Sequence, residues 1–595
     1  MSIAADLERA TASLAALCRR SFGPCGEETL LFRPPDAPVV TGEGHAVLAA
    51  LKRGSDACDP LTTFLLSAAD GVHKQLGDAS SEFILLVDAA TRHAAEGLRR
   101  EQDTRSDVDR ARMSRAFSGL KWELQREMQK ISGLQLAVPV EVDCETMQPS
   151  KQFRVTSATI VKSALGGVLG ERAVDFVVEL VLKWVFTAMD KGLFRRVQQY
   201  LKLAPDAIIH MAAPSVYGSY VVPCEDFILK KSVVTSQPPG ILDRCQGSVR
   251  FVCFTCPLSL TAGSNHVELA MSEDEELFTA HDAAHLFISK FVRRLRDQHH
   301  VQVIVSTEAL DESVVAVCTR QDIACVQLAE PEDVEALCTI GGTFPLASVF
   351  DNIENTKYVG VCTSGVSRHR HQEVVVPQLL IHAPTKGVYK QYYAAIVKSL
   401  RVLRSWWEPL HADSTQHPQH SSTVYCCRGG GATELAVARW LQAGSNKLSS
   451  VPRDGVMQTL ARQVLANALI EVVGVLRSNL NNTCSSASEE ELTSSQPTGN
   501  QRQVLLEAFS SLKLQEPQVF HGYTLNYARA VQTLAGPIQI PQLVIGDPEA
   551  YGLIHPWRRI DTLLFLVLQT LEQLFRIDRV FSKTTPGVTS TSTNN

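Results

Sequence analysis

The chain has 595 residues, a mass of 65.2 kDa and a formal net charge of −6, with 57 Lys and Arg against 63 Asp and Glu. Apolar residues make up 45% and charged residues 20%, which is ordinary globular composition and excludes wholesale disorder. The length predicts roughly three to five domains, and the near-balance of charge offers no global attraction to nucleic acid or to an anionic membrane.

We expect no targeting segment and no membrane span. Residues 1–17 carry Asp6, Glu8 and Arg9 and lack the charge order of a signal peptide. The best apolar run, residues 563–568, falls short of the ~18 residues that a span needs. Because the fifteen cysteines are scattered and odd in number, we expect reduced thiols and a cytoplasmic protein.

The first third of the chain is predicted to be mainly helical, with one small hairpin. Apolar residues recur at helical spacing over residues 5–20, and a Gly/Pro turn follows at residues 22–26. Short apolar runs at 30–32 and 39–40 predict the hairpin. Further helices are expected over residues 61–75, 81–99 and 111–131 and as a pair within 163–186.

The character of the sequence changes after about residue 205. Short β-rich runs appear, and a helix over residues 285–298 lies between some of them. This alternation predicts an α/β domain with a partly parallel sheet. The expected strands are residues 248–254, 301–306, 313–318, 323–328, 358–362 and 374–382.

From residue 389 onward the pattern is helical again. Polar stretches at 411–422 and 478–502 predict exposed loops, and the apolar stripe between them, at 456–476, predicts a helix. A last helix is expected over residues 561–575, before a disordered tail rich in Ser, Thr and Asn. The order helical, α/β, helical predicts an α/β domain inserted into a helical one.

Two short motifs are interpreted as structural. Cys253-x-x-Cys256 has metal-ligand spacing, but no second pair follows at zinc-finger distance, so buried cysteines are favoured. Trp406-Trp407 is interpreted as a core pair rather than an exposed anchor for a partner, because aromatic pairs bury a large area.

Three glycine-rich elements stand at intervals along the chain: Phe22-Gly23-Pro24-Cys25-Gly26, Gly77-Asp78-Ala79-Ser80-Ser81 and Gly429-Gly430-Gly431-Ala432-Thr433-Glu434. With the Thr41–Gly44 turn and Arg576–Val580, which stands in the place of the family's C-terminal strand, they resemble the type II (cytosolic, TCP-1-like) chaperonin family. Within that family the chain is most similar to the vertebrate chaperonin-like proteins of Bardet–Biedl syndrome. The resemblance covers nearly the whole chain.

The resemblance implies a multidomain α and α/β fold in which a helical equatorial domain is split between both ends of the chain. An intermediate domain and an inserted α/β apical domain lie between its halves. The implied boundaries are 1–130 and 406–582 for the equatorial domain, 131–205 and 366–405 for the intermediate domain, 206–365 for the apical domain and 583–595 for the disordered tail.

The resemblance also implies a nucleotide site for ATP and Mg²⁺, because a glycine-rich loop at a helix N-terminus suits phosphate. Asp78 is the implied magnesium ligand. The alternatives are a plain helix N-cap at Ser80 or Asp78 and a plain strand-to-helix connection helped by Glu434. The implied nucleotide-binding residues are Gly23, Pro24, Gly26, Gly44, Gly77, Asp78, Ala79, Ser80, Ser81, Gly429, Gly430, Gly431 and Glu434.

The chain departs from the family pattern at several of these positions. Ala79 replaces a glycine and places a Cβ where the backbone must approach phosphate or adopt positive φ. Glu27 and Glu28 stand where a basic residue is usual and would repel a polyphosphate. Lys398 occupies the position of the family's catalytic Asp, and an amine cannot orient water as a carboxylate does. We therefore expect no catalytic residue and slow or absent hydrolysis.

The function implied is a chaperonin-like assembly factor that helps to build a multiprotein ciliary trafficking complex (BBSome-type) with the cytosolic chaperonin. The implied partners are other Bardet–Biedl chaperonin-like proteins, cytosolic chaperonin subunits and ciliary complex subunits as clients, at the basal body or cilium. The alternatives are an ATP-dependent protein-folding chaperone and a nucleotide-independent protein-binding scaffold. The absence of a basic cluster weighs against a nucleic-acid partner.

Overall fold

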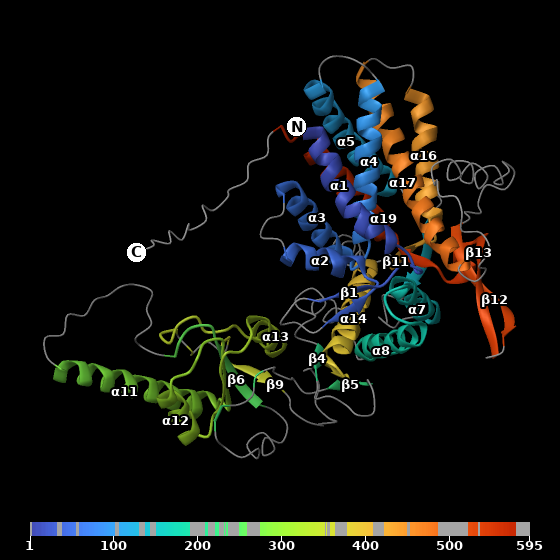
Figure 1. The fold of residues 1–595 in the computed structure, drawn as a ribbon. Helices are drawn as coiled ribbons and strands as arrows, with labels where there is room; N and C mark the ends of the chain where they lie inside the picture. The colour runs from blue at the N-terminus through green and yellow to red at the C-terminus, as the bar shows by residue number, and fades with distance from the viewer. Residues whose placement is uncertain are drawn as a thin grey trace, which may run out of the picture. The chain divides into compact units, whose positions relative to one another are not determined.

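Two units make up the computed structural model: unit 1 comprises Met1–Leu182 with Lys390–Asn595, and unit 2 comprises Lys183–Tyr389 (Figure 1). The two are described separately below. The structure describes residues 3–32, 38–54, 59–100, 106–129, 137–142, 150–190, 209–211, 220–224, 231, 234–235, 249–258, 274–351, 353, 357–362, 378–407, 422–448, 453–485, 522–533 and 536–578.

Helix α4 (Ser80–Arg100) is the central helix of unit 1. Its residues 83–87 are all at most 2% exposed, as expected of a helix that is apolar on most sides. Figure 1 shows it between other long helices of this unit. It contacts α1 (Ile3–Arg20), α2 (Gly44–Gly54), α3 (Pro60–Leu76), α17 (Arg453–Ser485) and α19 (Trp557–Leu574).

The remaining elements of unit 1 surround this core. The helices are α5 (Ser106–Gln129), α7 (Lys151–Leu165), α8 (Glu171–Asp190), α14 (Lys386–Trp407) and α16 (Ala432–Leu448), of which α8 and α14 cross a unit boundary in the sequence. The antiparallel sheets are β1 (Thr29–Leu31) with β2 (Val39–Thr41), β14 (Ile554–Pro556) with β11 (Ser422–Arg428) and β3 (Ala137–Val142), and β12 (Gly522–Thr533) with β13 (Gly536–Gly546).

Unit 2 contains a four-stranded sheet with helices on both faces. Strands β6, β7 and β8 are parallel and β9 joins β6 antiparallel. Side chains alternate between two cores, Phe254 and Ile304 packing with α11 and α12 and Phe251 and Val305 packing with α13. The elements are β6 (Val249–Phe254), α11 (Asp274–His299), β7 (Val303–Ser306), α12 (Glu312–Arg320), β8 (Ala324–Val326), α13 (Pro331–Gly341) and β9 (Gly360–Cys362).

A second small sheet of unit 2 has strand order β4-β10-β5. Strand β10 (Gln378–His382) runs parallel to β4 (Ile209–Met211) and antiparallel to β5 (Tyr220–Cys224). The fold class predicted from the sequence, a helical region at both ends of the chain with an inserted α/β region, is confirmed. The division into three domains stays a prediction.

Several predictions about single elements are wrong. Residues 313–318 form helix α12 and not a strand, because Val314 and Cys318 are buried on one face at i, i+4 spacing. The polar stretch predicted at 478–502 is helical up to Ser485, and its residues 486–502 lie outside the described residues. Arg576 to Asp578 form a turn and an irregular end, not a strand.

The sequence also underestimates the strands after residue 389. Strands β11, β12, β13 and β14 all lie there. Pro537 and Pro541 within β13 argue against a strand in the sequence, since proline cannot donate to a ladder. The predicted loop at 411–422 lies outside the described residues except for Ser422, which begins β11. The tail from 583 and the end of the expected strand at 579–580 also lie outside them.

The prediction of a buried pair is confirmed for the two tryptophans, and that of buried cysteines is confirmed for Cys253 only. Trp406 and Trp407 are at most 1% exposed, and both rings stack on Phe153, with centroids 4.9 and 6.0 Å away. Cys253 is fully buried in β6 beside Cys338, while Cys256 is half-buried. Trp406 and Trp407 thus belong to the interior of unit 1, and Cys253 belongs to the interior of unit 2.

One helix among the described residues, Gly455–Asn482 within α17, is long and apolar enough to cross a membrane by length and composition. The sequence expectation overlooked it because polar residues interrupt its apolar run. In the structure 61% of the apolar window is buried inside the protein, with Ala461, Leu465 and Leu469 at 0% exposure. A buried core helix passes the same test, so this is weak evidence of a span.

If α17 is a core helix, substitutions on its buried face must lower the free energy of unfolding more than substitutions on its exposed face. We expect Leu469→Ala to lower the free energy of unfolding by about 2–5 kcal/mol, because it leaves a cavity among α4, α16 and α17. The matched control is Val456→Ala on the same helix, at a residue 46% exposed, with an effect of at most about 0.5 kcal/mol. Urea denaturation measures both, and equal effects would contradict the assignment.

Candidate functional site

A tight turn between α3 and α4 places the phosphate-loop candidate. Helix α3 ends at Gly77, whose φ is +75° and whose N–H donates to His73 O at 2.8 Å. Ala79 follows at φ +69°, a conformation that costs an L-residue about 1 kcal/mol or more. The sequence predicted this choice between positive φ and a close approach. The first hydrogen bond of α4 then runs from Phe83 N–H to Ala79 O at 2.8 Å.

The turn borders a cavity of about 850 Å³ that lies entirely within unit 1. Most of the predicted site residues line it: Gly23, Pro24, Gly44, Asp78, Ala79, Ser80, Ser81, Gly430, Gly431 and Glu434. Gly26, Gly77 and Gly429 do not line it. Gly77 instead lies under α14, where an added Cβ would come within 3.0 Å of Lys398 O and Val402 N. Helix α14 therefore packs directly on the turn.

Lys398 reaches from α14 to the carboxylate of Asp78. Its Nζ lies 3.0 Å from Asp78 Oδ1 and 4.0 Å from Glu43 Oε1, and its side chain is 7% exposed. Burial opposes the charge of Lys398, but Asp78 and Glu43 outweigh burial and raise its pKa. Lys398 is therefore an ammonium that points into the cavity, at the position for which the sequence predicted it.

Arg559, near the start of α19, pairs with Asp78 as well and with two further carboxyl groups, Glu82 and Glu434. Its Nε lies 3.3 Å from Asp78 Oδ2, its NH2 2.5 Å from Glu82 Oε2 and its NH1 3.7 Å from Glu434 Oε1. Burial alone would raise the pKa of Asp78, but Lys398 and then Arg559 hold it well below its usual range. Both oxygens of Asp78 are thus paired with cations of this chain.

The other acids of the site retain protons more readily than free carboxyl groups. Burial raises the pKa of Glu43 and of Glu82, although Lys398 and Arg559 respectively oppose the shift. Burial and then the neighbouring Glu82 raise the pKa of Glu434 to about 7, against the opposing charge of Arg559. The site holds several carboxyl groups and compensates them with internal cations and protons.

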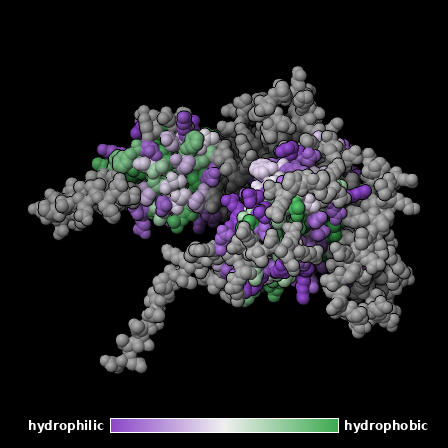
Figure 2. Space-filling model, turned by 90° about the horizontal axis from the view of Figure 1, so that it is seen from above, coloured by the Kyte–Doolittle hydropathy of each residue, from purple (hydrophilic) through white to green (hydrophobic). Residues whose placement is uncertain are grey.

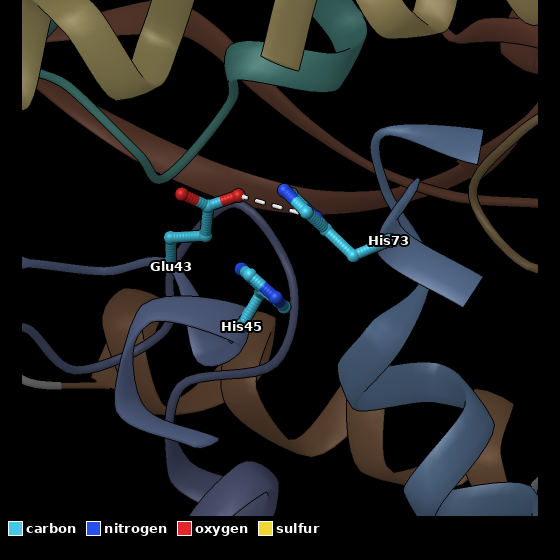
Figure 3. Close-up of side chains that lie close together, drawn as sticks. All are labelled: Glu43, His45 and His73. Carbon is cyan, nitrogen blue, oxygen red and sulfur yellow. Dashed lines mark ion pairs between the residues drawn. The ribbon is translucent and has the colours of Figure 1, made fainter. Parts of the chain in front are cut away.

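Three imidazoles also line the cavity, of which His73 is buried and His45 and His555 are half-buried. Burial lowers the pKa of His555 to about 3 and that of His73 to about 2, and it lowers the pKa of His45, so all three are neutral near pH 7. His45 and His73 stack with their ring centroids 3.5 Å apart and face Glu43 (Figure 3). His73 Nδ1 lies 4.0 Å from Glu43 Oε1.

The third glycine element joins β11 to α16. Gly430 and Gly431 have φ of +63° and +83°, and the Gly430 carbonyl accepts from Tyr523 N–H at 2.8 Å. Thr433 Oγ1 donates to Arg428 O at 2.7 Å across the connection. The structure therefore contains the tight strand-to-helix connection of the alternative interpretation, while both glycines and Glu434 also line the cavity.

The prediction for Glu27 and Glu28 is wrong. Both side chains are exposed, neither lines the cavity, and Glu27 pairs with Arg20 at 3.8 Å. The side chains that follow a turn in the sequence need not face the same way as the turn, and here they do not reach the cavity. The acids that do line it include Glu43, Glu82 and Glu434.

The sequence missed Arg559, Glu82 and the three histidines. A signal for Arg559 existed, because it stands four residues before Leu563 on the apolar face of α19, where a charged side chain needs a buried partner. That partner, Asp78, is 481 residues away in the sequence. No local pattern indicated His73 or His555.

Two comparisons relate the chain to known proteins. Residues 14–582 match the family model of the TCP-1/cpn60 chaperonin family. The chain is similar in fold to a solved structure described as a group III chaperonin in the open state, with a TM-score of 0.58, 14% sequence identity and coverage of 97% of this chain and 98% of the other. No curated protein sequence matches the chain.

The raised pKa of Glu434 predicts a pH dependence of stability. The folded protein holds a proton that the unfolded chain releases above pH 4.5, so the free energy of unfolding falls as pH rises from about 4.5 to 7. Glu434→Gln, which keeps the shape, removes this dependence. We expect it to raise the free energy of unfolding by about 1–3 kcal/mol at pH 8 and to change it little at pH 4.

Urea denaturation across this pH range measures the effect. The matched control is Glu549→Gln, at an exposed acid that pairs with Arg428 at 3.0 Å, and it should not alter the pH dependence. A Glu434→Gln protein less stable than the unmodified one at pH 8 would show that Glu434 is ionised and stabilised by Arg559.

Proposed function

The chain belongs to the TCP-1/cpn60 chaperonin family, and we propose that it acts as a chaperonin-like assembly factor that holds partner proteins without efficient ATP turnover. The observation that carries the proposal is the pairing of both Asp78 oxygens with Lys398 and Arg559. The charges around that pair support each part of the argument.

Members of this family typically bind ATP with Mg²⁺, and the residues of this site do not fit that pair. Mg²⁺ needs oxygen ligands at about 2.1 Å in octahedral geometry, and the Asp78 oxygens face an ammonium and a guanidinium instead. Glu43 and Glu82 add buried carboxyl groups beside the place of a triphosphate. A magnesium ion would have to displace Lys398 from Asp78, so no catalytic step is assigned to the metal.

The side chain that α14 offers to the cavity is also unsuited to hydrolysis. Phosphoryl transfer to water depends on a group that orients the attacking water, and a carboxylate does this by accepting a hydrogen bond. Lys398 is a protonated donor with no acceptor, and the described part of α14 contains no Asp or Glu. This supports absent or very slow turnover.

Unit 2 supplies a surface suited to holding a partner. Leu286 is 56% exposed, Phe287 36% and Phe350 72%, and the rings of Phe287 and Phe350 lie 5.5 Å apart. Figure 2 shows hydrophobic side chains among hydrophilic ones on the described surface of the protein. Exposed aromatic side chains that contact one another favour a protein-binding role over a purely structural one.

The identity of the partners is proposed from resemblance. The chain would help to assemble a ciliary trafficking complex of the BBSome type together with other Bardet–Biedl chaperonin-like proteins and subunits of the cytosolic chaperonin. It would act in the cytoplasm and at the basal body. The ATP-driven foldase is the second candidate, favoured by the retained glycine turns and the hydroxyls of Ser80 and Ser81 at the cavity.

Replacing the ammonium by a carboxylate separates the two candidates. We expect the unmodified protein to show no ATP hydrolysis above background. Lys398→Asp should gain magnesium-dependent ATP binding and a turnover on the order of 10²-fold above that background, because it frees Asp78 and supplies a group that can orient water. Calorimetry and a phosphate-release assay measure the two gains, and Mg²⁺ with ATP should raise the melting temperature of this variant but not that of the unmodified protein.

The matched control is Lys398→Met, which removes the charge but adds no carboxylate. Because it also frees one oxygen of Asp78, it should gain some magnesium-dependent ATP binding but no turnover. Clear hydrolysis by the unmodified protein would reject the assembly factor without turnover and favour the foldase.

The role in assembly needs a test in ciliated cells. Depletion of the protein should leave subunits of the ciliary complex unassembled, and re-expression of either the unmodified protein or Lys398→Met should restore assembly to a similar level. Sedimentation of the complex and co-purification with the cytosolic chaperonin are the measurements. Normal assembly after depletion would exclude the ciliary role.

A further inference from the structure

Glu43, His45 and His73 bring three potential metal ligands together at one side of the cavity. Glu43 ends the turn before α2, His45 lies in the first turn of α2 and His73 lies in the last turn of α3. One ligand atom from each lies within 4.8 Å of the others. Figure 3 shows the carboxylate and the two imidazoles converging.

The atoms that face one another in this cluster lack hydrogen bonds. Glu43 Oε1 and His73 Nδ1 are buried without a hydrogen-bond partner, and their side chains are each 8% exposed. They lie 4.0 Å apart, which is too far for a hydrogen bond. Two buried polar atoms left in this way cost about 1–3 kcal/mol each. A ligand bound between the two atoms would remove this cost.

A divalent transition-metal ion fits that gap better than Mg²⁺ does. Zn–N and Zn–O bonds are each about 2.0–2.2 Å, so an ion that bridges the two atoms at a tetrahedral angle needs them ~3.4 Å apart, an inward shift of ~0.6 Å. The stacked rings must tilt apart for both to bind. Two imidazoles with one carboxylate are ligands for Zn²⁺ and similar ions, whereas Mg²⁺ and Ca²⁺ prefer oxygen alone.

The surroundings of the two histidines suit coordination. His45 Nε2 lies 3.4 Å from Asp70 Oδ1, the carboxylate–histidine contact that orients metal-binding imidazoles in other proteins. That contact leaves the other ring nitrogen of His45 for the ion.

Lys398 opposes a cation at this place. Its Nζ lies 4.0 Å from the same oxygen, Glu43 Oε1, and Arg401 adds positive charge nearby. Because Lys398 is held more closely by Asp78, at 3.0 Å, Glu43 can bind an ion without leaving Lys398 unpaired. The ammonium nevertheless weakens the affinity, so its removal should strengthen metal binding.

We propose that Glu43, His45 and His73 form a three-ligand site for a divalent transition metal of the Zn²⁺ class, with a fourth position open to the cavity. This site stands apart from the proposed function, since it needs neither ATP nor a client. The alternative without a metal is that Glu43 is protonated and moves closer to donate a hydrogen bond to His73 Nδ1.

The test is metal binding to the chelator-treated full-length protein. Competition against a chromophoric chelator should show one Zn²⁺ per chain at this site and no comparable binding of Mg²⁺. Glu43→Gln, His45→Gln and His73→Gln should each weaken the affinity by at least ~10²-fold, Asp70→Asn by about 10–100-fold, and Lys398→Met should strengthen it. The matched control is His93→Gln, at a histidine 3.2 Å from Glu471, which should bind Zn²⁺ normally.

Cobalt substitution keeps the test independent of how the variants fold. Because the chain has fifteen cysteines, Zn²⁺ can also bind thiolates, and Co²⁺ distinguishes the two. The unmodified protein should show visible bands of four-coordinate Co²⁺ without thiolate-to-cobalt charge transfer. A spectrum of thiolate-bound Co²⁺ alone, unchanged affinity in all three ligand variants, or equal affinity for Mg²⁺ would each overturn the proposal.

Discussion

The carboxylate of Asp78 organises the whole cavity of unit 1. It lies on the turn between α3 and α4, and each of its oxygens is paired with a cation from a different helix, Lys398 from α14 and Arg559 from α19. The acid is 481 residues from Arg559 in the sequence, so this pairing joins the two ends of the chain. A buried charge is stable only when it is paired and hydrogen-bonded, which makes the three side chains interdependent. Removing Lys398 or Arg559 leaves Asp78 with one cation instead of two.

This pairing also fixes α14 on the turn. Lys398 attaches the middle of the helix to Asp78, the backbone of Gly77 lies close under Lys398 O and Val402 N, and Trp406 stacks on Phe153 at its end. In a site built for a metal nucleotide, the positive charge arrives with the ligand, and the protein supplies the carboxylates. Here the chain itself carries the positive charge. The contact between α14 and the turn therefore does not depend on a ligand, which suits a protein that holds partners more than one that cycles.

Much of this could be predicted from the sequence, and the reason for each failure is physical. The fold class followed from the resemblance that the ordered glycine motifs carry, and the same resemblance singled out Lys398 and Ala79, which both line the cavity. The strand predicted at residues 313–318 was wrong because a valine-rich run suits a buried helix face as well as a strand. The prediction for Glu27 and Glu28 did not hold because a position next to a turn in the chain does not determine which way a side chain points. Arg559 and His73 were missed because their partners come from packing between distant segments.

Glu43 links the charged network to the histidine cluster. One oxygen of this buried carboxylate lies 4.0 Å from both Lys398 Nζ and His73 Nδ1, and it makes a hydrogen bond with neither. Charges interact strongly where water is excluded. A positive group that moved closer to Glu43 Oε1 would therefore weaken the attraction between this oxygen and Lys398. The state of the histidine cluster therefore acts on Lys398 through a single atom. Lys398 is part of α14 and pairs with Asp78. A ligand bound by His45 and His73 would therefore change the strength of the contact between that helix and the turn of Asp78.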